Sequence, residues 1–191
     1  QEFPSAAVSA EDLVLTLPLV KPRHYSISSS AEVHPRALQL TVGVLKVCRN
    51  RFCSREQGTT RRGLCSHHLQ RLTPGELVGP GTGISPIMGF LQARAQALRK
   101  GAAPSLAPCL VYFGCRDSSE TLYAEQMRRW VEEGVITELH VAKSREGTKT
   151  YVQHLIGRQH AKVWNVLRDP SCHVYLCGDS SMGEEVKAEV R

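Results

Sequence analysis

A glycine-rich stretch, Gly79-Pro80-Gly81-Thr82-Gly83, offers the first chemistry that the sequence suggests. Three glycines occupy five positions directly before a predicted helix, so the backbone can approach a ligand closely. Thr82 and Ser85 add hydroxyl groups, and the helix N-terminus adds N–H groups that have no partner within the helix. This combination suits a pyrophosphate. The spacing departs from GxGxxG, and an ordinary turn between a strand and a helix is the alternative.

Three cations come later in the chain, after strand-like runs. Arg116 and Arg145 each follow such a run, and Lys149 comes shortly after the second. Because the carboxyl ends of parallel strands meet at one edge of a sheet, we expect these cations to converge there, with Tyr151 able to stack on an adenine. Two arginines and a lysine suit NADPH, which carries a 2′-phosphate, better than NADH, which lacks it. Three solvated surface cations are the alternative.

A third strand-like run ends in Cys177-Gly178-Asp179 and places a thiol and a carboxylate at the same edge. A cysteine in an apolar run is often a packing residue. Its position at an edge that suits a dinucleotide favours a functional role.

The elements that must position these residues follow from the periodicity of apolar residues after Val78. Short apolar runs alternate with longer amphipathic ones, which predicts βαβ units and a doubly wound parallel sheet with helices on both faces. Gly101 and Gly134 fall just after two predicted helices, where a left-handed residue is favoured. The predicted helices cover 84–100, 120–133, 150–167 and 182–190, and the predicted strands cover 109–113, 136–142 and 173–177.

The first part of the chain is predicted to be mainly β. Strands are expected at 25–28 and 38–47, followed by a basic surface loop and a short helix at 66–72. Only Leu77-Val78 separates the first part from the glycine-rich stretch, which is too short for a buried strand, so we expect residues to be missing near Glu76 to Val78.

Composition narrows the class of protein further. The 191 residues are 41% apolar and carry a formal net charge of +6, which indicates anionic partners. Neither a signal peptide nor an apolar run long enough to span a membrane is visible, and we expect a soluble fragment of a longer protein. The odd number of cysteines, some of them inside apolar runs, favours reduced thiols over a disulfide framework. They lie at 48, 53, 65, 109, 115, 172 and 177.

Six runs in order along the chain resemble the diflavin reductases, the group of NADPH–cytochrome P450 reductase and the reductase region of nitric oxide synthase. These runs are KPRHYSISSS, RRGLCSHHL, GPGTGISP, YFGCRDSSETLYAEQM, AKSREGTKTYVQHL and VYLCGDSSM. The resemblance extends to ferredoxin–NADP reductases. It implies an antiparallel FAD-binding β-barrel at 1–76, present here in part, followed by an α/β domain at 77–191 that binds NADPH.

The resemblance also implies roles for single residues. Arg23 is expected to contact the FAD pyrophosphate, Tyr25 to pack on the isoalloxazine ring, and Ser26 to hydrogen-bond near flavin N5. The turn that holds the FAD diphosphate is expected at Gly63, Leu64, Cys65 and Ser66.

For NADPH, the resemblance implies pyrophosphate contacts at Gly81, Thr82 and Gly83. Cys177 and Asp179 are expected beside the reacting nicotinamide, where they would act with Ser26 in hydride transfer. The adenosine 2′-phosphate side is expected at Arg116, Ser144, Arg145, Lys149, Tyr151 and Gln153.

As a whole, the resemblance implies a reductase that takes a hydride from NADPH onto FAD. It further implies an FMN domain, in cis or in trans, that passes electrons to a heme protein on the cytoplasmic side, with room for a membrane anchor outside this stretch. The P450 reductase and nitric oxide synthase branches both stay open. No nucleic acid and no metal are expected.

Two other functions compete with this interpretation. Cys48, Cys53, Cys65 and His67 could ligate zinc within an arginine-rich stretch and so form a nucleic-acid-binding module, although the spacing lacks a CxxC pair. The second competing function is a module that binds NADPH without redox activity, because binding motifs do not prove turnover.

Overall fold

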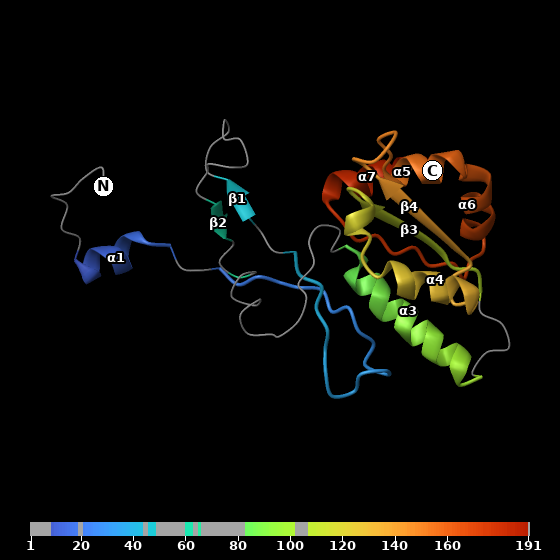
Figure 1. Ribbon diagram of the computed structural model, residues 1–191, viewed down its shortest axis with the longest axis horizontal. Coiled ribbons are helices and arrows are strands. Elements are labelled where there is room, and N and C mark those ends of the chain that lie inside the picture. The colour runs from blue at the N-terminus through green and yellow to red at the C-terminus, as the bar shows by residue number, and fades with distance from the viewer. Residues whose placement is uncertain are drawn as a thin grey trace.

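A computed structural model describes most of the second half of the chain and shorter pieces of the first half (Figure 1). In two of the strands only the backbone is described, at 46–48 and 60–62. The described residues are 9–18, 21–43, 46–48, 60–62, 65, 83–101 and 107–190.

Two parallel strands form the centre of the α/β part. Strand β3, Leu110–Cys115, pairs with β4, Glu138–Lys143, in a register that runs from Leu110 opposite Glu138 to Cys115 opposite Lys143. The chain passes between them through a 3₁₀ turn, η1 (Ser118–Glu120), and helix α4 (Ala124–Glu132). The predicted strands at 109–113 and 136–142 are confirmed, and their β-branched and aromatic residues explain why they are extended.

Helices cover both faces of this sheet, as predicted (Figure 1). On one face, α3 (Ile84–Arg99) and α4 bury their apolar sides against alternate residues of β3, and Met88 and Met127 are fully enclosed there. On the other face, α5 (Val152–Arg158), α6 (His160–Leu167) and α7 (Ser180–Glu189) gather around Ile156. Since side chains alternate along a strand, β3 serves both cores.

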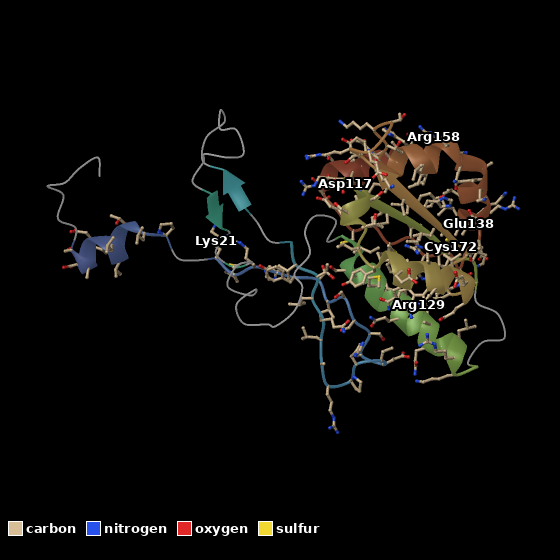
Figure 2. All side chains as sticks on the ribbon, in the orientation of Figure 1. Lys21, Asp117, Arg129, Glu138, Arg158 and Cys172 are labelled. Carbon is tan, nitrogen blue, oxygen red and sulfur yellow. The ribbon has the colours of Figure 1, made fainter. Side chains whose placement is uncertain are left out.

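The two ends of the sheet carry different polar groups (Figure 2). Glu138, where β4 begins, accepts from Lys162 Nζ at 2.9 Å and contacts His140 Nε2 at 3.0 Å. These bonds lower the pKa of the Glu138 carboxyl, and the bond from Lys162 has the largest effect. Asp117 lies at the opposite end, just after β3. The Asp117 end is the carboxyl end of β3, where parallel sheets bind ligands.

Two glycines end helices as predicted. Gly101 follows α3 with φ 63°, and Gly134 follows α4 with φ 74°. This left-handed region favours glycine, because a side chain would clash with the backbone there.

The first part of the chain has little regular structure among its described residues. Helix α1, Ala10–Thr16, starts at Ser9, whose hydroxyl accepts from the Asp12 N–H. Strands β1 (Lys46–Cys48) and β2 (Thr60–Arg62) pair antiparallel. Of the predicted strands at 25–28 and 38–47, the described residues form one bridge, Ile27 with Leu40, and β1. The predicted helix at 66–72 lies outside the described residues.

Two contacts attach this first part to the α/β part. The backbone N–H of Ser30 donates to Gln92 Oε1 of α3 at 2.9 Å, and this bond is buried. The hydroxyls of Thr41 and Tyr123 are 2.6 Å apart. The N-terminal segment therefore lies against α3 and the start of α4.

Three sequence predictions need correction. The helix predicted at 150–167 is two helices, because Gln159 leaves helical geometry with φ −113° and ψ 20°. The helix predicted at 120–133 starts only at Ala124, after a left-handed Tyr123. The segment 173–177, predicted as a strand, has no regular secondary structure and pairs with no described strand, and its apolar side chains Val174, Tyr175 and Leu176 are about half exposed. A strand needs a hydrogen-bonded neighbour, whatever its propensity.

Candidate nucleotide site

A pocket of about 430 Å³ lies where the carboxyl ends of β3 and β4 meet the first turns of α5 and α7. Its position is the one at which parallel sheets bind ligands. Its volume falls in the usual range for small-molecule sites, roughly 300–1,000 Å³. The lining residues are Gly114, Cys115, Arg116, Ala142, Ser144, Thr150, Tyr151, Val152, Gln153, Asp179, Ser181, Met182 and Glu185.

The strand ends bring Arg116 and Ser144 together. The N–H of Ser144 donates to the Cys115 carbonyl at 3.0 Å, and the N–H of Arg145 donates to the Arg116 carbonyl at 2.7 Å, so the ladder continues past both strands. The Arg116 guanidinium pairs with Glu120 at 3.0 Å and is 41% exposed. Arg116 and Ser144 therefore put a cation and a hydroxyl on the same wall of the pocket.

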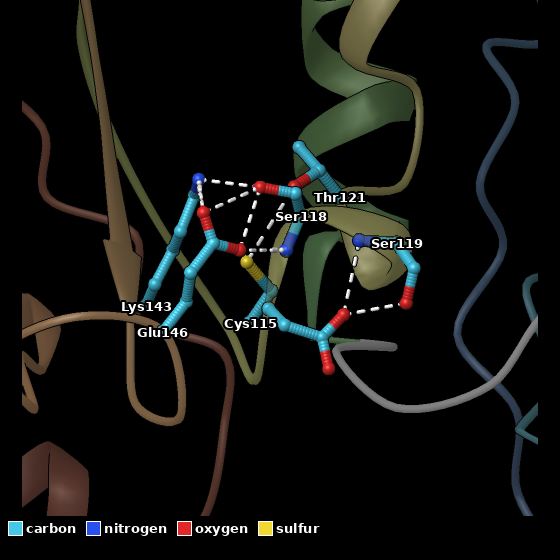
Figure 3. A network of polar contacts seen from close by, with 7 residues as sticks. Cys115, Ser118, Ser119, Thr121, Lys143 and Glu146 are labelled. Atoms are coloured by element: carbon cyan, nitrogen blue, oxygen red, sulfur yellow. Dashed lines mark hydrogen bonds and ion pairs between the residues drawn. The ribbon is translucent and has the colours of Figure 1, made fainter.

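The loop after β4 is held by a polar network (Figure 3). Glu146 accepts from Lys143 Nζ at 2.7 Å and from the Ser118 N–H at 2.7 Å. Bonds from Lys143 and then from the hydroxyl and backbone of Ser118 lower the pKa of the Glu146 carboxyl to about 2. This network fixes the loop that carries Ser144 and Arg145 against η1. Sequence reasoning missed Glu146, although it directly follows Arg145.

The other two predicted cations lie outside the pocket wall. Arg145 and Lys149 are exposed, and neither lines the pocket. The Lys149 ammonium is 5.2 Å from the centre of the Tyr151 ring, a cation–π contact. Tyr151 itself lines the pocket and is 39% exposed.

The start of α7 forms a second wall. Asp179 accepts from the Met182 N–H at 2.8 Å and from the Ser181 hydroxyl at 2.7 Å. These bonds lower the pKa of the Asp179 carboxyl, and the bond from the Met182 N–H has the largest effect. Asp179 is therefore the N-cap of α7 as well as a pocket residue. The sequence prediction placed Asp179 beside nicotinamide and did not include this capping role.

Gly83, which ends the glycine-rich stretch and precedes α3, lies against the Cys177 backbone. A Cβ on Gly83 would be 2.5 Å from the Cys177 carbonyl oxygen, so glycine is required there. The Cys177 thiol is free and exposed and does not line the pocket. Structure thus brings Gly83 and Cys177 together, next to Asp179.

Gln153 is the most buried polar side chain of the pocket wall, at 7% exposed. Its amide nitrogen donates to Glu185 at 2.6 Å, and its Oε1 atom is buried and has no hydrogen-bond partner among the described residues. Sequence reasoning named Gln153 and missed Glu185. No local signal identifies Glu185, because its partner Gln153 lies 32 residues earlier in the chain.

The residues expected to bind FAD are described only in part. Arg23 is exposed and donates to the Lys21 carbonyl at 2.9 Å, Tyr25 is half-buried, and Ser26 is exposed. Cys65 has a half-buried free thiol. The other expected FAD contacts, Gly63, Leu64 and Ser66, lie outside the described residues, as do Gly81 and Thr82, which are expected at the NADPH pyrophosphate.

The zinc alternative gains no support from the part of the chain that the structure describes. It contains no group of three or more His, Cys, Asp or Glu side chains that could hold a metal ion. Of the proposed ligands, the side chains of Cys48, Cys53 and His67 lie outside the description. No helix among the described residues is long and apolar enough to cross a membrane.

Two domain families match the chain. The FAD binding domain family matches residues 1–68, and the oxidoreductase NAD-binding domain family matches residues 77–188. The boundary at 76 stays a prediction, because neither match fixes where one domain ends.

Similar proteins match nearly the whole chain. It is 33% identical to NADPH–cytochrome P450 reductase of Mus musculus over 214 residues, covering 98% of this chain and 31% of that protein. It is 32% identical to a nitric oxide synthase-like protein of Bombyx mori over 216 residues, with 100% and 19% covered. The inducible nitric oxide synthase of Canis lupus familiaris is 36% identical over 214 residues, with 97% and 18% covered.

These matches define FAD-binding and NAD-binding domains of the ferredoxin reductase-like type. The chain belongs to the diflavin reductase family. It spans 31% of the mouse reductase and less than a fifth of the two synthase relatives quoted. The aligned lengths exceed the 191 residues of this chain, so the relatives carry residues that it lacks. Their location near Glu76 to Val78 stays a prediction.

Proposed function

We propose that this chain is the FAD- and NADPH-binding part of a flavoprotein reductase that transfers a hydride from NADPH to FAD. The observation that carries the proposal is the pocket at the carboxyl ends of β3 and β4, where Arg116, Ser144, Tyr151 and Gln153 meet. Its volume suits one end of a dinucleotide. Family membership supplies the flavin half of the proposal.

Within this pocket, the adenosine end of NADPH would be held by groups of matching chemistry. The Tyr151 ring would stack on adenine, and the Arg116 guanidinium and Ser144 hydroxyl would meet a phosphate. Arg145 and Lys149 stand exposed just outside the pocket, from where their long side chains can reach the 2′-phosphate. The pyrophosphate would then lie along Gly81, Thr82 and Gly83 at the start of α3.

For the flavin, the proposal assigns Arg23 to the pyrophosphate, Tyr25 to the ring and Ser26 to the neighbourhood of N5. Gly63, Leu64, Cys65 and Ser66 would form the diphosphate turn. When bound, FAD supplies a hydride acceptor that can release electrons singly. The Ser26 hydroxyl would donate a hydrogen bond at the reacting end, while Cys177 and Asp179 would orient the nicotinamide from the side of α7.

We also propose the larger setting of this module. The FAD part is an antiparallel barrel within 1–76, and the NADPH part is a doubly wound sheet within 77–191. Electrons would leave through an FMN domain to a heme protein on the cytoplasmic side. These assignments rest on the relatives, which are named as NADPH–cytochrome P450 reductase and as a nitric oxide synthase-like protein.

Anaerobic titration of the FAD-loaded chain with NADPH tests the proposal. We expect retained flavin absorbance that bleaches as NADPH is added, and a weaker response to NADH. Binding of NADPH without retained flavin would instead indicate a module that only binds the nucleotide. Absence of both flavin retention and NADPH binding would refute the proposed function.

A further inference from the structure

The hydroxyl of Tyr123 joins the α/β part to the first part of the chain. Its oxygen lies 2.6 Å from Thr41 Oγ1, although the two residues are 82 positions apart in sequence. Both residues are partly buried, so water competes only weakly for this hydrogen bond. Tyr123 therefore makes a direct contact between two segments that are distant along the chain.

The backbone of Tyr123 has an unfavourable conformation at the start of α4. Among the described residues, Tyr123 is the one non-glycine residue with a positive φ, at 56°. A side chain disfavours this left-handed region, so the surrounding structure must hold the residue there. The Tyr123 carbonyl accepts from the Met127 N–H at 2.9 Å, and the side chain packs against the core shared by α3, β3 and α4. Residues held in this way cluster at functional sites, which is a reason to expect a role beyond starting a helix.

The turn that ends at Tyr123 begins at the pocket. Arg116 lines the pocket, and its guanidinium pairs with Glu120 of η1 at 3.0 Å. Cys115, another pocket residue, has its sulfur 3.6 Å from the Thr121 hydroxyl. Two side-chain contacts therefore tie the residues just before Tyr123 to the pocket wall, which fixes Tyr123 relative to a ligand bound there.

On the other side of the bond, Thr41 belongs to an antiparallel pair of segments. Ile27 forms a bridge with Leu40 in this pair. Because the two segments run in opposite directions, the next position of the register places Thr41 opposite Ser26. The hydroxyl of Tyr123 therefore holds the residue that faces Ser26 across the pair.

We infer that Tyr123 is a positioning residue for hydride transfer, acting through its bond to Thr41. The inference rests on the proposed function, which assigns Ser26 to the neighbourhood of flavin N5. In that reaction NADPH gives up a hydride, which carries two electrons, and FAD accepts it. Transfer requires the two reacting groups to be close and aligned, so a shift of the Ser26 position against the pocket lowers the rate and leaves nucleotide binding unchanged.

Rapid-mixing spectra of the FAD-loaded chain with NADPH test this inference. Thr41→Val keeps the shape of the side chain but removes its hydroxyl, whereas Thr41→Ser keeps the hydroxyl. We expect flavin reduction by NADPH to be about three- to tenfold slower in Thr41→Val, the equivalent of one hydrogen bond, with unchanged NADPH affinity. Thr41→Ser should match the parent. Dithionite reduces a flavin without nicotinamide, so its rate should be the same in the parent and both variants.

Tyr123→Phe removes the same bond from the α/β side. We expect it to slow flavin reduction by the same factor, and the double variant T41V/Y123F to be no slower than either single variant, because both changes remove one shared bond. Tyr112→Phe is the matched control, since its hydroxyl donates to Gln159 at 3.0 Å within the α/β part and should not affect the rate. Additive effects in the double variant would overturn the inference.

Hydrogen exchange separates positioning from a merely structural role. The Ser28 N–H donates to the Gln39 carbonyl at 2.8 Å, so its exchange reports whether the pair of segments stays formed. In Thr41→Val we expect Ser28 to exchange at the parent rate while reduction by NADPH slows. Faster exchange at Ser28, together with slower reduction by dithionite as well, would mean that the bond only stabilises the pair, which overturns the inference.

The same spectra distinguish failure of the inference from failure of the proposed function. Parent rates of flavin reduction in Thr41→Val and Tyr123→Phe would refute the positioning role and leave the proposed function intact. A parent chain that retained no flavin, or whose flavin NADPH did not reduce, would refute the proposed function and this inference with it.

Discussion

The Lys143 ammonium lies 2.7 Å from the Glu146 carboxylate, so an ion pair closes the loop that follows β4. The same carboxylate accepts from Ser118 of η1, which joins this loop to the one that follows β3. Ser144 and Arg145 lie between the paired residues in sequence. Their positions at the pocket edge therefore depend on a contact that neither of them makes.

Glu146→Gln should weaken nucleotide binding without removing any residue that would touch the nucleotide. The substitution takes away the charge that attracts Lys143, so the loop carrying Ser144 and Arg145 gains freedom. We expect 2′,5′-ADP to bind about three- to tenfold more weakly, in line with a lost charge-assisted hydrogen bond. Glu132→Gln, on α4, is the control. Parent-like affinity of Glu146→Gln would show that the loop is held by other means.

The same carboxylate gives an acid-range prediction. Its folded-state pKa is lowered to about 2 from an ordinary 4.5, so its contacts stabilise the fold fully above about pH 4.5. That stabilisation is lost as the pH falls from there through 2. Carboxyl resonances followed by NMR against pH should show Glu146 titrating near 2. A midpoint near 4.5 would mean that the network does not persist in solution.

Gly83→Ala should destabilise the junction of the glycine-rich stretch with α3. The new Cβ would lie 2.5 Å from a backbone oxygen, that of Cys177, and backbone cannot move aside as a flexible side chain can. Overpacking of this kind costs about 1–3 kcal/mol. Gly183→Ala is the matched control, because nothing lies within 4 Å of its Cβ position and alanine favours a helix. Thermal melts should show a lower Tm for Gly83→Ala and an equal or higher Tm for Gly183→Ala.

Sequence reasoning located the parallel strands and the helices around them because those segments carry local signals. Apolar runs with β-branched residues preceded Gly114 and Ser144, and glycines marked two helix ends. The division at Gln159 gave no such signal. Its side chain accepts from the Tyr112 hydroxyl at 3.0 Å and lies 3.3 Å from His140, so the break depends on contacts with two strands far away in sequence.

The candidate site was predictable to the same degree. Gln153, Tyr151, Ser144 and Arg116 were named from resemblance and strand ends, and all line one pocket, although their roles stay predictions. Glu185 was not, because its partner is 32 residues away. The segment 173–177 has the composition of a strand, yet it pairs with no described strand, and Tyr175 packs against Phe90 with ring centres 4.7 Å apart. Local propensity cannot supply a missing strand neighbour.

Arg145→Ala should reduce the preference for NADPH over NADH. The exposed guanidinium stands beside the pocket, where a 2′-phosphate would form a charge-assisted bond that NADH cannot form. We expect about tenfold weaker binding of NADPH and unchanged binding of NADH. Arg158→Ala, which removes an exposed arginine at the other end of α5, should change neither. Equal affinity of Arg145→Ala and the parent for NADPH would refute the assignment.

Ser26→Ala should slow flavin reduction and leave NADPH affinity nearly intact. The hydroxyl is assigned to the reacting end of the flavin, away from the nucleotide pocket, so its loss affects hydride transfer and not binding. Rapid-mixing spectra of the FAD-loaded chain measure the rate, and we expect a decrease of about tenfold or more. A decrease in NADPH affinity with an unchanged rate of flavin reduction would contradict the assignment of Ser26 to the reacting end of the flavin.

Gln92→Met should loosen the N-terminal segment from α3. The buried Gln92 oxygen accepts from the Ser30 N–H at 2.9 Å, and Gly89 lies one turn earlier with its Cβ position 3.2 Å from the Ser29 carbonyl. Methionine fills similar space but leaves the Ser30 N–H buried without a partner, which costs about 1–3 kcal/mol. Gln96→Met, one turn further along α3, is the control. Hydrogen exchange should show faster exchange at Ser30 in Gln92→Met alone, and unchanged exchange there would mean that the two parts of the chain are joined by other contacts.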